Sequence, residues 1–420
     1  MSGNFAVGIA LAVVALVPFA PANAGKDTIV YSFTGGIDGA SPTSGFVADG
    51  AGNLYSTTAG GGSFGQGTVF EITPGGAETV LYSFTGGSDG ASPQAGLVRD
   101  AAGNLFGTTL EGGANALGTV FMLAPDGTEK VLHSFQGGNL DGANPLAGLV
   151  ADGKGSFYGT TEDGGSQACG AGCGTVFKIS RTGKLKIIHY FEGSPDGADP
   201  IAGVVADAAG NLYGTTLGGG EQSDFCGVGC GTVFELSPAG KNSWTETLPH
   251  SFQPGGSDGI NPGAGLFVDG KGNLYGTTTA GGNLNDCIAD QGCGTVFELS
   301  RAGGGWIETV LYAFKGGSDG SSPYAGLIQA SNGNLFGATF EGGLNNCPFS
   351  SGCGTVFELT RKGDEKVVHA FNGPPSDGAN SQSALFSDGK GNLYGTTVAG
   401  GATKACFENQ GCGTVFRLKQ

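Results

Sequence analysis

The chain has 420 residues, of which 86 are glycine and only 13% are charged, yet 27 phenylalanines and 10 tyrosines supply bulky apolar side chains. This composition excludes a disordered chain of low complexity, because the aromatic residues can build a core. The formal net charge of −17 excludes nucleic acid and anionic membranes as expected partners, because like charges repel.

The first 24 residues have the features of a cleaved signal peptide. An apolar run over residues 5–19 is followed by the cleavage pattern Ala-Asn-Ala at residues 22–24. No basic residue precedes the run, so an uncleaved anchor is the alternative, although Pro18 interrupts the run and it is short for a membrane span. We therefore predict an exported protein whose mature part, residues 25–420, forms one domain with no membrane span.

A repeat fills the mature chain. In its second copy, short runs bounded by Gly, Asp and Pro predict strands at residues 79–84, 96–98, 105–109 and 118–123. Seven copies of Gly-Asn-Leu-Phe-Gly-Thr-Thr or a close variant begin at Gly52, Gly103, Gly155, Gly210, Gly272, Gly333 and Gly391. Seven copies of Gly-Thr-Val-Phe begin at Gly67, Gly118, Gly174, Gly231, Gly294, Gly354 and Gly413. Four strands in each unit of about 50 to 60 residues favour propeller blades over a solenoid, whose β repeats are shorter.

The two ends of the repeat array are offset by one strand. Residues 28–33 have an outer-strand sequence, and residues 413–418 have a third-strand sequence after which the chain stops. In a ring, the first strand completes the last blade and leaves no free edge. We therefore predict an all-β fold, a seven-bladed β-propeller of four-stranded blades whose N-terminal strand closes the last blade. Replacing Val30 by Pro is expected to obstruct that pairing.

Aspartates recur at two positions in the repeat. Asp100 begins a predicted hairpin turn, and Ala330 replaces it in the sixth copy. Asp89 precedes Gly in a loop between blades, where Asp-Gly, with Ser, Asn or Asp before Pro, favours a hydrogen-bonded turn. The equivalent residues are Asp38, Asp141, Asp196, Asp258, Asp319 and Asp377. The alternative for this set is a ring of carboxylates that binds a cation.

All ten cysteines lie in the long loops that precede Gly-Thr-Val-Phe, on the face that also carries the loops between blades. They occur only in the five copies whose loops are longer, so we predict one disulfide within each loop. Zinc binding is the alternative, but it would need four ligands to converge from separate blades. The predicted pairs are Cys169–Cys173, Cys226–Cys230, Cys287–Cys293, Cys347–Cys353 and Cys406–Cys412.

The recurring segments Gly-Asn-Leu-Tyr-Gly-Thr-Thr, Gly-Thr-Val-Phe-Glu-Leu, Tyr-Ser-Phe and Asp-Gly-x-x-Pro resemble the GloVer (Gloeo/Verruco) tandem repeat of bacterial choice-of-anchor proteins over residues 28–418. The resemblance implies an exported bacterial repeat protein and supplies no activity to transfer. Because the chain ends at Gln420 without a C-terminal sorting tail, we expect a secreted protein, extracellular or periplasmic, rather than a surface-anchored one.

Candidate site residues are those that vary where their neighbours do not. The residue at the start of each innermost strand is Thr43, Gln94, Leu146, Ile201, Gly263, Tyr324 or Gln382, and Arg99 and Gln329 stand out later on their strands. These side chains are expected to form a ligand-facing rim around the central opening, with neutral surface variation as the alternative. The four histidines, His133, His189, His250 and His369, occupy positions that hold tyrosine in other copies, so packing is expected rather than general-base catalysis.

We predict no catalytic residue, cofactor or metal ligand. Gly-x-Ser-x-Gly matches fall in glycine-rich loops without a following helix and are chance matches. The function favoured is a monomeric, non-catalytic binding or scaffold protein that holds a saccharide or an extracellular protein on the disulfide-clipped face. The alternative is a propeller enzyme, a polysaccharide lyase or a lactonase, in which one copy would carry unique reactive side chains; Tyr324, Arg99 and Glu341 are the candidates, although Glu111 duplicates Glu341.

Overall fold

The computed structural model describes most of the mature chain. The described residues are 27–222, 226–240, 243–255, 257–283, 287, 291–343, 347, 351–402, 406 and 410–419. The predicted signal peptide lies outside them. Within these ranges, the structure contains no helix with the length and apolar character needed to cross a membrane.

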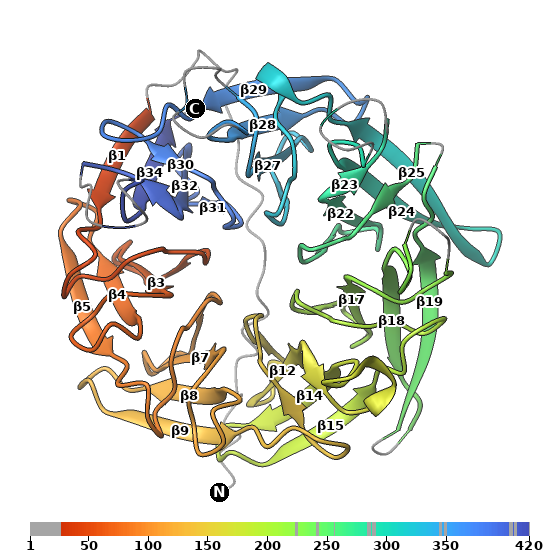
Figure 1. Cartoon of the computed structure of the whole chain (residues 1–420), viewed down its shortest axis with the longest axis horizontal. Coiled ribbons are helices and arrows are strands. Elements are labelled where there is room, and N and C mark those ends of the chain that lie inside the picture. The colour runs from red at the N-terminus through yellow and green to blue at the C-terminus, as the bar shows by residue number, and fades with distance from the viewer. Residues whose placement is uncertain are drawn as a thin grey trace, which may run out of the picture.

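Seven four-stranded antiparallel sheets stand in a ring around a central axis (Figure 1), which confirms the predicted seven-bladed β-propeller. The innermost strand of each blade is only two residues long. The first three blades are β2(Val47–Ala48) β3(Leu54–Thr58) β4(Thr68–Ile72) β5(Glu78–Ser83), β6(Val98–Arg99) β7(Leu105–Thr109) β8(Thr119–Leu123) β9(Glu129–Ser134), and β11(Val150–Ala151) β12(Ser156–Thr161) β14(Thr175–Ser180) β15(Leu185–Tyr190).

The next three blades follow in the same order. They are β16(Val205–Ala206) β17(Leu212–Thr216) β18(Thr232–Pro238) β19(Trp244–Ser251), β21(Phe267–Val268) β22(Leu274–Thr278) β24(Thr295–Ala302) β25(Gly305–Ala313), and β26(Ile328–Gln329) β27(Leu335–Thr339) β28(Thr355–Leu359) β29(Glu365–Ala370). The seventh blade is built from both ends of the chain, as β31(Phe386–Ser387) β32(Asn392–Thr397) β34(Thr414–Lys419) β1(Asp27–Ser32).

The ring closes as predicted, with β1 paired antiparallel to β34 from Asp27 opposite Leu418 to Ser32 opposite Thr414. Val30 is the extra residue of a β-bulge in this pairing and has no partner on β34. The corresponding position of the fourth blade is Pro249, also at an irregularity of the outer strand. The bulge therefore removes the basis for expecting that Pro at position 30 would break the closure.

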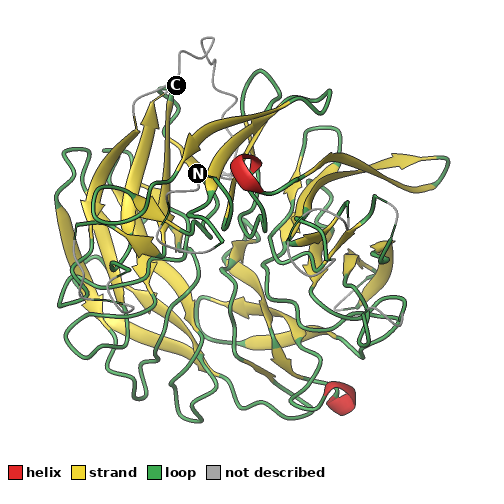
Figure 2. Cartoon of the chain, turned by 45° about the horizontal axis from the view of Figure 1, so that its top comes forward, coloured by secondary structure: helices red, strands yellow, loops and turns green. Residues whose placement is uncertain are grey.

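The loops between blades lie beside the long loops, as the propeller strand order requires. Two-stranded ribbons join them in three blades, as β10(Gly142–Ala143) with β13(Asp163–Gly164), β20(Gly259–Ile260) with β23(Ala280–Gly281), and β30(Gly378–Ala379) with β33(Ala399–Gly400). Single bridges such as Ala91 to Glu111 do the same in the other four blades. Among the described residues, two short 3-10 helices, η1(Gln167–Cys169) and η3(Gly317–Asp319), lie in these loops, and the remainder consists of strands and connecting loops (Figure 2).

The Gly-Thr-Thr segment explains why the repeat is so regular. A Cβ on Gly107 would lie 2.8 Å from the Phe121 ring, so glycine leaves room for this phenylalanine of Gly-Thr-Val-Phe to fill the blade. In the first blade the same position is Ser56, opposite the buried Phe70. The hydroxyl of Thr108 donates to the Ala147 carbonyl of the next blade at 2.9 Å, and Thr109 and Thr119 share a 2.9 Å hydrogen bond within the blade. These repeated residues are thus structural.

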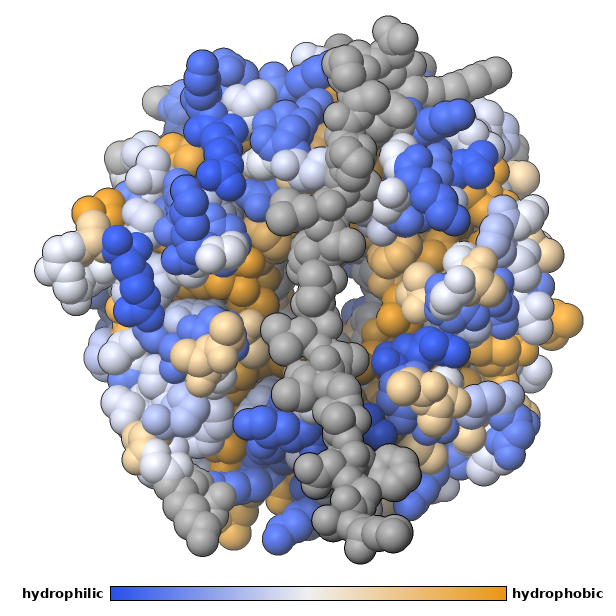
Figure 3. All heavy atoms as spheres, turned by 180° about the vertical axis from the view of Figure 1, so that it is seen from behind, coloured by the Kyte–Doolittle hydropathy of each residue, from blue (hydrophilic) through white to orange (hydrophobic). Residues whose placement is uncertain are grey.

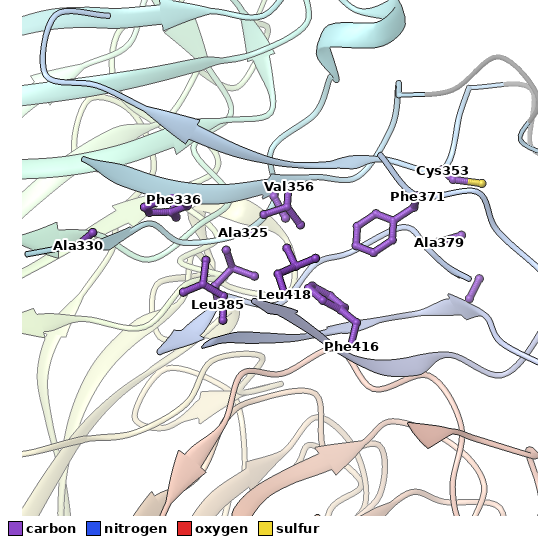
Figure 4. Packing of buried hydrophobic residues seen from close by; sticks show 13 residues of the cluster. Ala325, Ala330, Phe336, Cys353, Val356, Phe371, Ala379, Leu385, Phe416 and Leu418 are labelled. Atoms are coloured by element: carbon purple, nitrogen blue, oxygen red, sulfur yellow. The ribbon is translucent and has the colours of Figure 1, made fainter. Parts of the chain in front are cut away.

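The core is divided into clusters that join each blade to its neighbour. Between the sixth and seventh blades, Phe371 of the outer-strand end and Phe416 of β34 meet edge to face, with ring centroids 5.1 Å apart (Figure 4). Leu385 and Leu418 pack in the same cluster and are almost fully buried. Because β34 contributes to this cluster and also pairs with β1, the closing blade belongs to the continuous core of the ring.

Candidate functional site

The innermost strands approach one another closely around the axis. A Cβ on Gly148 would lie 2.8 Å from the Gly96 carbonyl oxygen of the preceding blade, and a Cβ on Gly326 would lie 3.3 Å from the Gly265 carbonyl oxygen. Seven small residues form this ring, namely Gly45, Gly96, Gly148, Gly203, Gly265, Gly326 and Ala384. Apolar residues border the middle of the molecule on the face shown in Figure 3. Because the ring residues themselves have small side chains or none, a molecule bound near the axis would contact the side chains next to the ring.

The predicted rim residues stand two positions before these small residues, and their environments differ. Thr43 is committed to structure, because its hydroxyl donates to the Gln94 carbonyl of the next blade at 2.8 Å. The Gln94 amide lies 3.4 Å from the Ser92 hydroxyl within its own loop. Leu146 and Gln382 are partly buried, and Tyr324 is the most exposed of the set at 40%.

Ile201, Gly263 and Tyr324 come together on three consecutive blades. A Cβ on Gly263 would lie 3.6 Å from Ile201 Cδ1 and 3.7 Å from Tyr324 Cδ1. Thr279 Cγ2 would lie 3.5 Å from the same Cβ, so a methyl group would be in ordinary contact with all three side chains. The narrow gap that glycine leaves between Ile201 and Tyr324 is called the notch below. Phe340 supports the tyrosine edge to face, with ring centroids 5.6 Å apart. Burial, and then the charge of Glu341, raise the pKa of Tyr324, so its hydroxyl stays protonated at neutral pH.

Arg99 and Gln329 lie at the other end of the innermost strands and do not join this notch. The Arg99 guanidinium is 5.7 Å from the centroid of the Tyr55 ring on the preceding blade. The Gln329 amide donates to the Gly333 carbonyl at 3.4 Å, within the adjacent turn. Arg99 thus contacts strand β3 of the preceding blade and Gln329 contacts a turn of its own blade, so both lie apart from the other seven predicted rim residues.

Each turn aspartate accepts hydrogen bonds as its sequence position indicates. Asp100 Oδ1 accepts from the backbone amides of Ala102 and Asn104 at 3.0 and 2.9 Å. Burial acts to raise the pKa of Asp100, but hydrogen bonds from Asn104 and the charge of Arg181 outweigh it and lower the pKa. The carboxylate is therefore ionised and structural.

The aspartates between blades lie at the junctions of neighbouring blades, called seams below. In each seam an outer strand, the loop that follows it and the next outer strand meet. Asp89 Oδ2 accepts from the Thr85 amide at 2.8 Å and from the hydroxyl of Tyr82, on the outer strand, at 3.0 Å. Histidine takes the place of this tyrosine elsewhere, as in His133, whose Nε2 is 3.0 Å from Asp141 Oδ2. Each of the seven aspartates contacts the Tyr or His of its own seam, which supports the turn hypothesis and offers no shared ring of carboxylates.

Sequence reasoning missed a third member of these seams, a glutamate at the start of the next outer strand. Glu129 of β9 faces the Tyr82 and Asp89 pair, and its Oε1 is buried without a hydrogen-bond partner. Burial, and then the charge of Asp89, raise the pKa of Glu129 to about 7. The equivalent residues are Glu78, Glu246, Glu308 and Glu365. Each of these glutamates stands four residues before the Tyr or His of the same strand. This constant spacing is the sequence signal that could have identified them.

The predicted disulfides are all present, and no described cysteine is free. They rest on the loops between blades, where a Cβ on Gly193 would lie 3.3 Å from Cys169 Sγ. In the two blades without cysteine, Gln66 and Leu117 occupy the corresponding place, 2.9 Å from the Cβ positions of Gly86 and Gly137. The bridge thus replaces a side chain that would otherwise support the neighbouring loop.

The loop face also carries large apolar side chains that are exposed to solvent. Ile37 and Leu140 project from loops between blades, and Phe64 and Val228 project from the long loops. The four side chains come from separate loops, and single exposed apolar residues are common on protein surfaces. They do not by themselves define a binding surface.

Fold and loops together define the class of this protein, a seven-bladed β-propeller with disulfide-clipped loops on one face. The sequence pattern of the Gloeobacter/Verrucomicrobia repeat matches residues 15–172 and 168–404. The chain therefore belongs to the Gloeobacter/Verrucomicrobia repeat family, as the sequence resemblance indicated. A comparison of the sequence with curated proteins gives no match.

Solved structures share the fold at low sequence identity. Virginiamycin B lyase from Staphylococcus aureus has a TM-score of 0.55 at 13% identity, with 94% of this chain and 98% of the lyase covered. A fungal alcohol oxidase of the AA5 family has a TM-score of 0.58 at 11% identity over 94% of this chain and 77% of the oxidase. The extracellular domain of a hybrid two-component system from B. thetaiotaomicron has a TM-score of 0.53 at 14% identity, over 90% of this chain and 39% of that one. These likenesses show the fold alone.

Proposed function

We propose that this chain is an exported, non-catalytic propeller that binds a saccharide at the notch formed by Ile201, Gly263 and Tyr324. The observation that carries the proposal is the exposed Tyr324 ring beside an empty side-chain position. Aromatic rings present a rigid apolar face with a polar edge, which suits the faces and hydroxyls of a sugar. Export is supported by the five disulfides, because such bonds persist in oxidising compartments.

The test is a glycan array read together with a turnover screen on acidic polysaccharides and lactones. We expect saturable binding without product. Tyr324→Ala should weaken that binding about tenfold or more, the loss typical of a central aromatic contact. Tyr190→Ala is the matched control, because Tyr190 is similarly exposed at 37% but lies on the outer strand β15.

Gly263→Gln is a second variant that acts by filling the notch. Two other repeats carry glutamine at the same position, Gln94 and Gln382, and the backbone of Gly263 is outside the left-handed region, so the fold should tolerate the change. Binding that survives both Tyr324→Ala and Gly263→Gln would contradict the proposed site. Product formation would replace the binding proposal with the lyase or lactonase alternative, and an array with no bound glycan would refute the saccharide.

A further inference from the structure

The seam between the third and fourth blades differs from the others in how its polar groups are arranged. His189 of β15, Asp196 of the connecting loop and Glu246 of β19 converge there from three segments. His189 Nε2 lies 3.5 Å from Asp196 Oδ2 and 3.4 Å from Glu246 Oε1. Neither approach is a well-aligned hydrogen bond, and one ligand atom from each residue lies within 4.8 Å of the other two.

Each of these three residues has a buried polar atom without a hydrogen-bond partner, namely His189 Nε2, Asp196 Oδ1 and Glu246 Oε1. The side chains are only 17%, 16% and 20% exposed. Polar groups buried in this way cost free energy unless something satisfies them. In four of the other six seams one buried atom of this kind is found, a glutamate oxygen. Three such atoms in one place indicate a missing common partner.

The chemistry of the seam points to a cation as that partner. Two carboxyl groups and one imidazole offer ligand atoms within 4.8 Å of one another at this place. Carboxylate oxygens and a neutral imidazole nitrogen are electron-pair donors, so a cation is the partner that could contact all three atoms at once.

The spacing fits a small divalent ion. Metal–ligand distances of about 2.0 to 2.1 Å at tetrahedral angles place two ligand atoms about 3.4 Å apart, and the two distances from His189 Nε2 are 3.4 and 3.5 Å. We propose that His189, Asp196 and Glu246 form a binding site for one divalent cation of the zinc type. Imidazole with two carboxylates is a donor set that such ions accept.

Two other seams have similar residues but a different hydrogen-bond arrangement. In the next seam, His250 Nε2 is already hydrogen-bonded to both oxygens of Asp258, at 3.3 and 3.2 Å, beside Glu308. That histidine is satisfied without an ion. The seam of Tyr82, Asp89 and Glu129 has both carboxyl groups but no imidazole. We therefore assign the ion to the His189 seam.

The experiment uses the mature protein without a histidine tag, stripped with chelator, reloaded with Zn²⁺ and passed through gel filtration before elemental analysis. We expect one Zn²⁺ per chain, and at least tenfold weaker Zn²⁺ binding by calorimetry in Glu246→Gln and in His189→Gln. Glu308→Gln and Glu129→Gln are matched controls that should keep the ion. Co²⁺ added to the stripped protein should give the visible absorption of a tetrahedral site in the parent and not in Glu246→Gln.

Three outcomes would overturn the assignment. They are a protein that retains no Zn²⁺, a Glu246→Gln variant that binds the ion as the parent does, and loss of the ion in Glu308→Gln with retention in Glu246→Gln. Melting curves of the stripped variants show whether each is folded, so a loss of binding is not confused with unfolding. The site lies on the outer strands, so these results are independent of saccharide binding at Tyr324.

Discussion

At the scale of single residues, the seam glutamates are the least expected part of this protein. Glu129 is half-buried and faces Asp89. Burial is the larger cause and the charge of Asp89 the smaller one, and together they raise the pKa of Glu129 to about 7 from the ordinary value of 4.5. Between these two values the folded protein binds more protons than the unfolded chain. Stability contributed by this group is therefore complete below pH 4.5 and is lost as the pH rises through about 7.

Glu129→Gln tests this pH dependence. The amide cannot ionise, so at pH 8 the variant should melt roughly 1 to 2 °C above the parent, a small shift because the group is partly solvated. At pH 4.5 the difference should shrink or reverse, since the parent glutamate is then protonated. Melting curves at the two pH values measure the change, and the comparison between them removes any effect of the amide on packing. An equal difference at both values would contradict the raised pKa.

At the scale of strands, neighbouring blades are joined by polar contacts as well as by the core. Arg301 of β24 reaches across to Glu235 of β18, with Nη2 2.7 Å from Oε1, and also donates to the Tyr213 hydroxyl at 3.2 Å. Its guanidinium stacks on Trp306 of β25, 4.2 Å from the ring centroid. The Glu235 carboxylate is buried, so Arg301 supplies its counter-charge.

Arg301→Ala should therefore destabilise the protein by about 1 to 2 kcal/mol, less than a fully buried pair would because the arginine is itself partly exposed. The reason is a buried carboxylate left without its charge partner. Glu235→Gln combined with Arg301→Ala should recover part of the loss, and a double-mutant cycle by thermal unfolding measures the coupling. Effects that simply add would show that the pair does not stabilise the seam.

Most strands could be predicted from sequence, and the seams could not. Residues 105–109 and 119–123 are β-branched and aromatic runs between glycines, so local pattern and period were sufficient. The loop turns were harder, because Ser92 before Pro93 has a φ of 53°, a left-handed conformation that local propensity disfavours for serine. The notch at Gly263 and the three-residue seams depend on contacts between residues of different blades. Such residues are far apart in the sequence, so local sequence patterns do not show these contacts.

At the scale of the whole molecule, closure of the ring joins the seven repeats into one continuous structure. The seventh blade takes β1 from one end of the chain and β31, β32 and β34 from the other. Its residues also enter the core clusters on both sides, with Phe416 against the sixth blade and Val415 against the first. Because both neighbours share this blade, we expect the ring to unfold as a unit.

Deleting β1 tests this account most directly. The parent is residues 25–420 and the variant is residues 33–420, with Val30→Pro as a control that should be tolerated because Val30 is unpaired in the bulge. The deletion exposes the edge of β34 and opens the seam between the first and last blades. We predict that the variant's melting temperature is at least roughly 10 °C below that of the parent, a far larger decrease than the loss of one terminal strand would cause in an open array. We also expect the variant to associate through the exposed edge of β34. A variant that stays monomeric in gel filtration and melts within about 2 °C of the parent would contradict closure as the source of the molecule's stability.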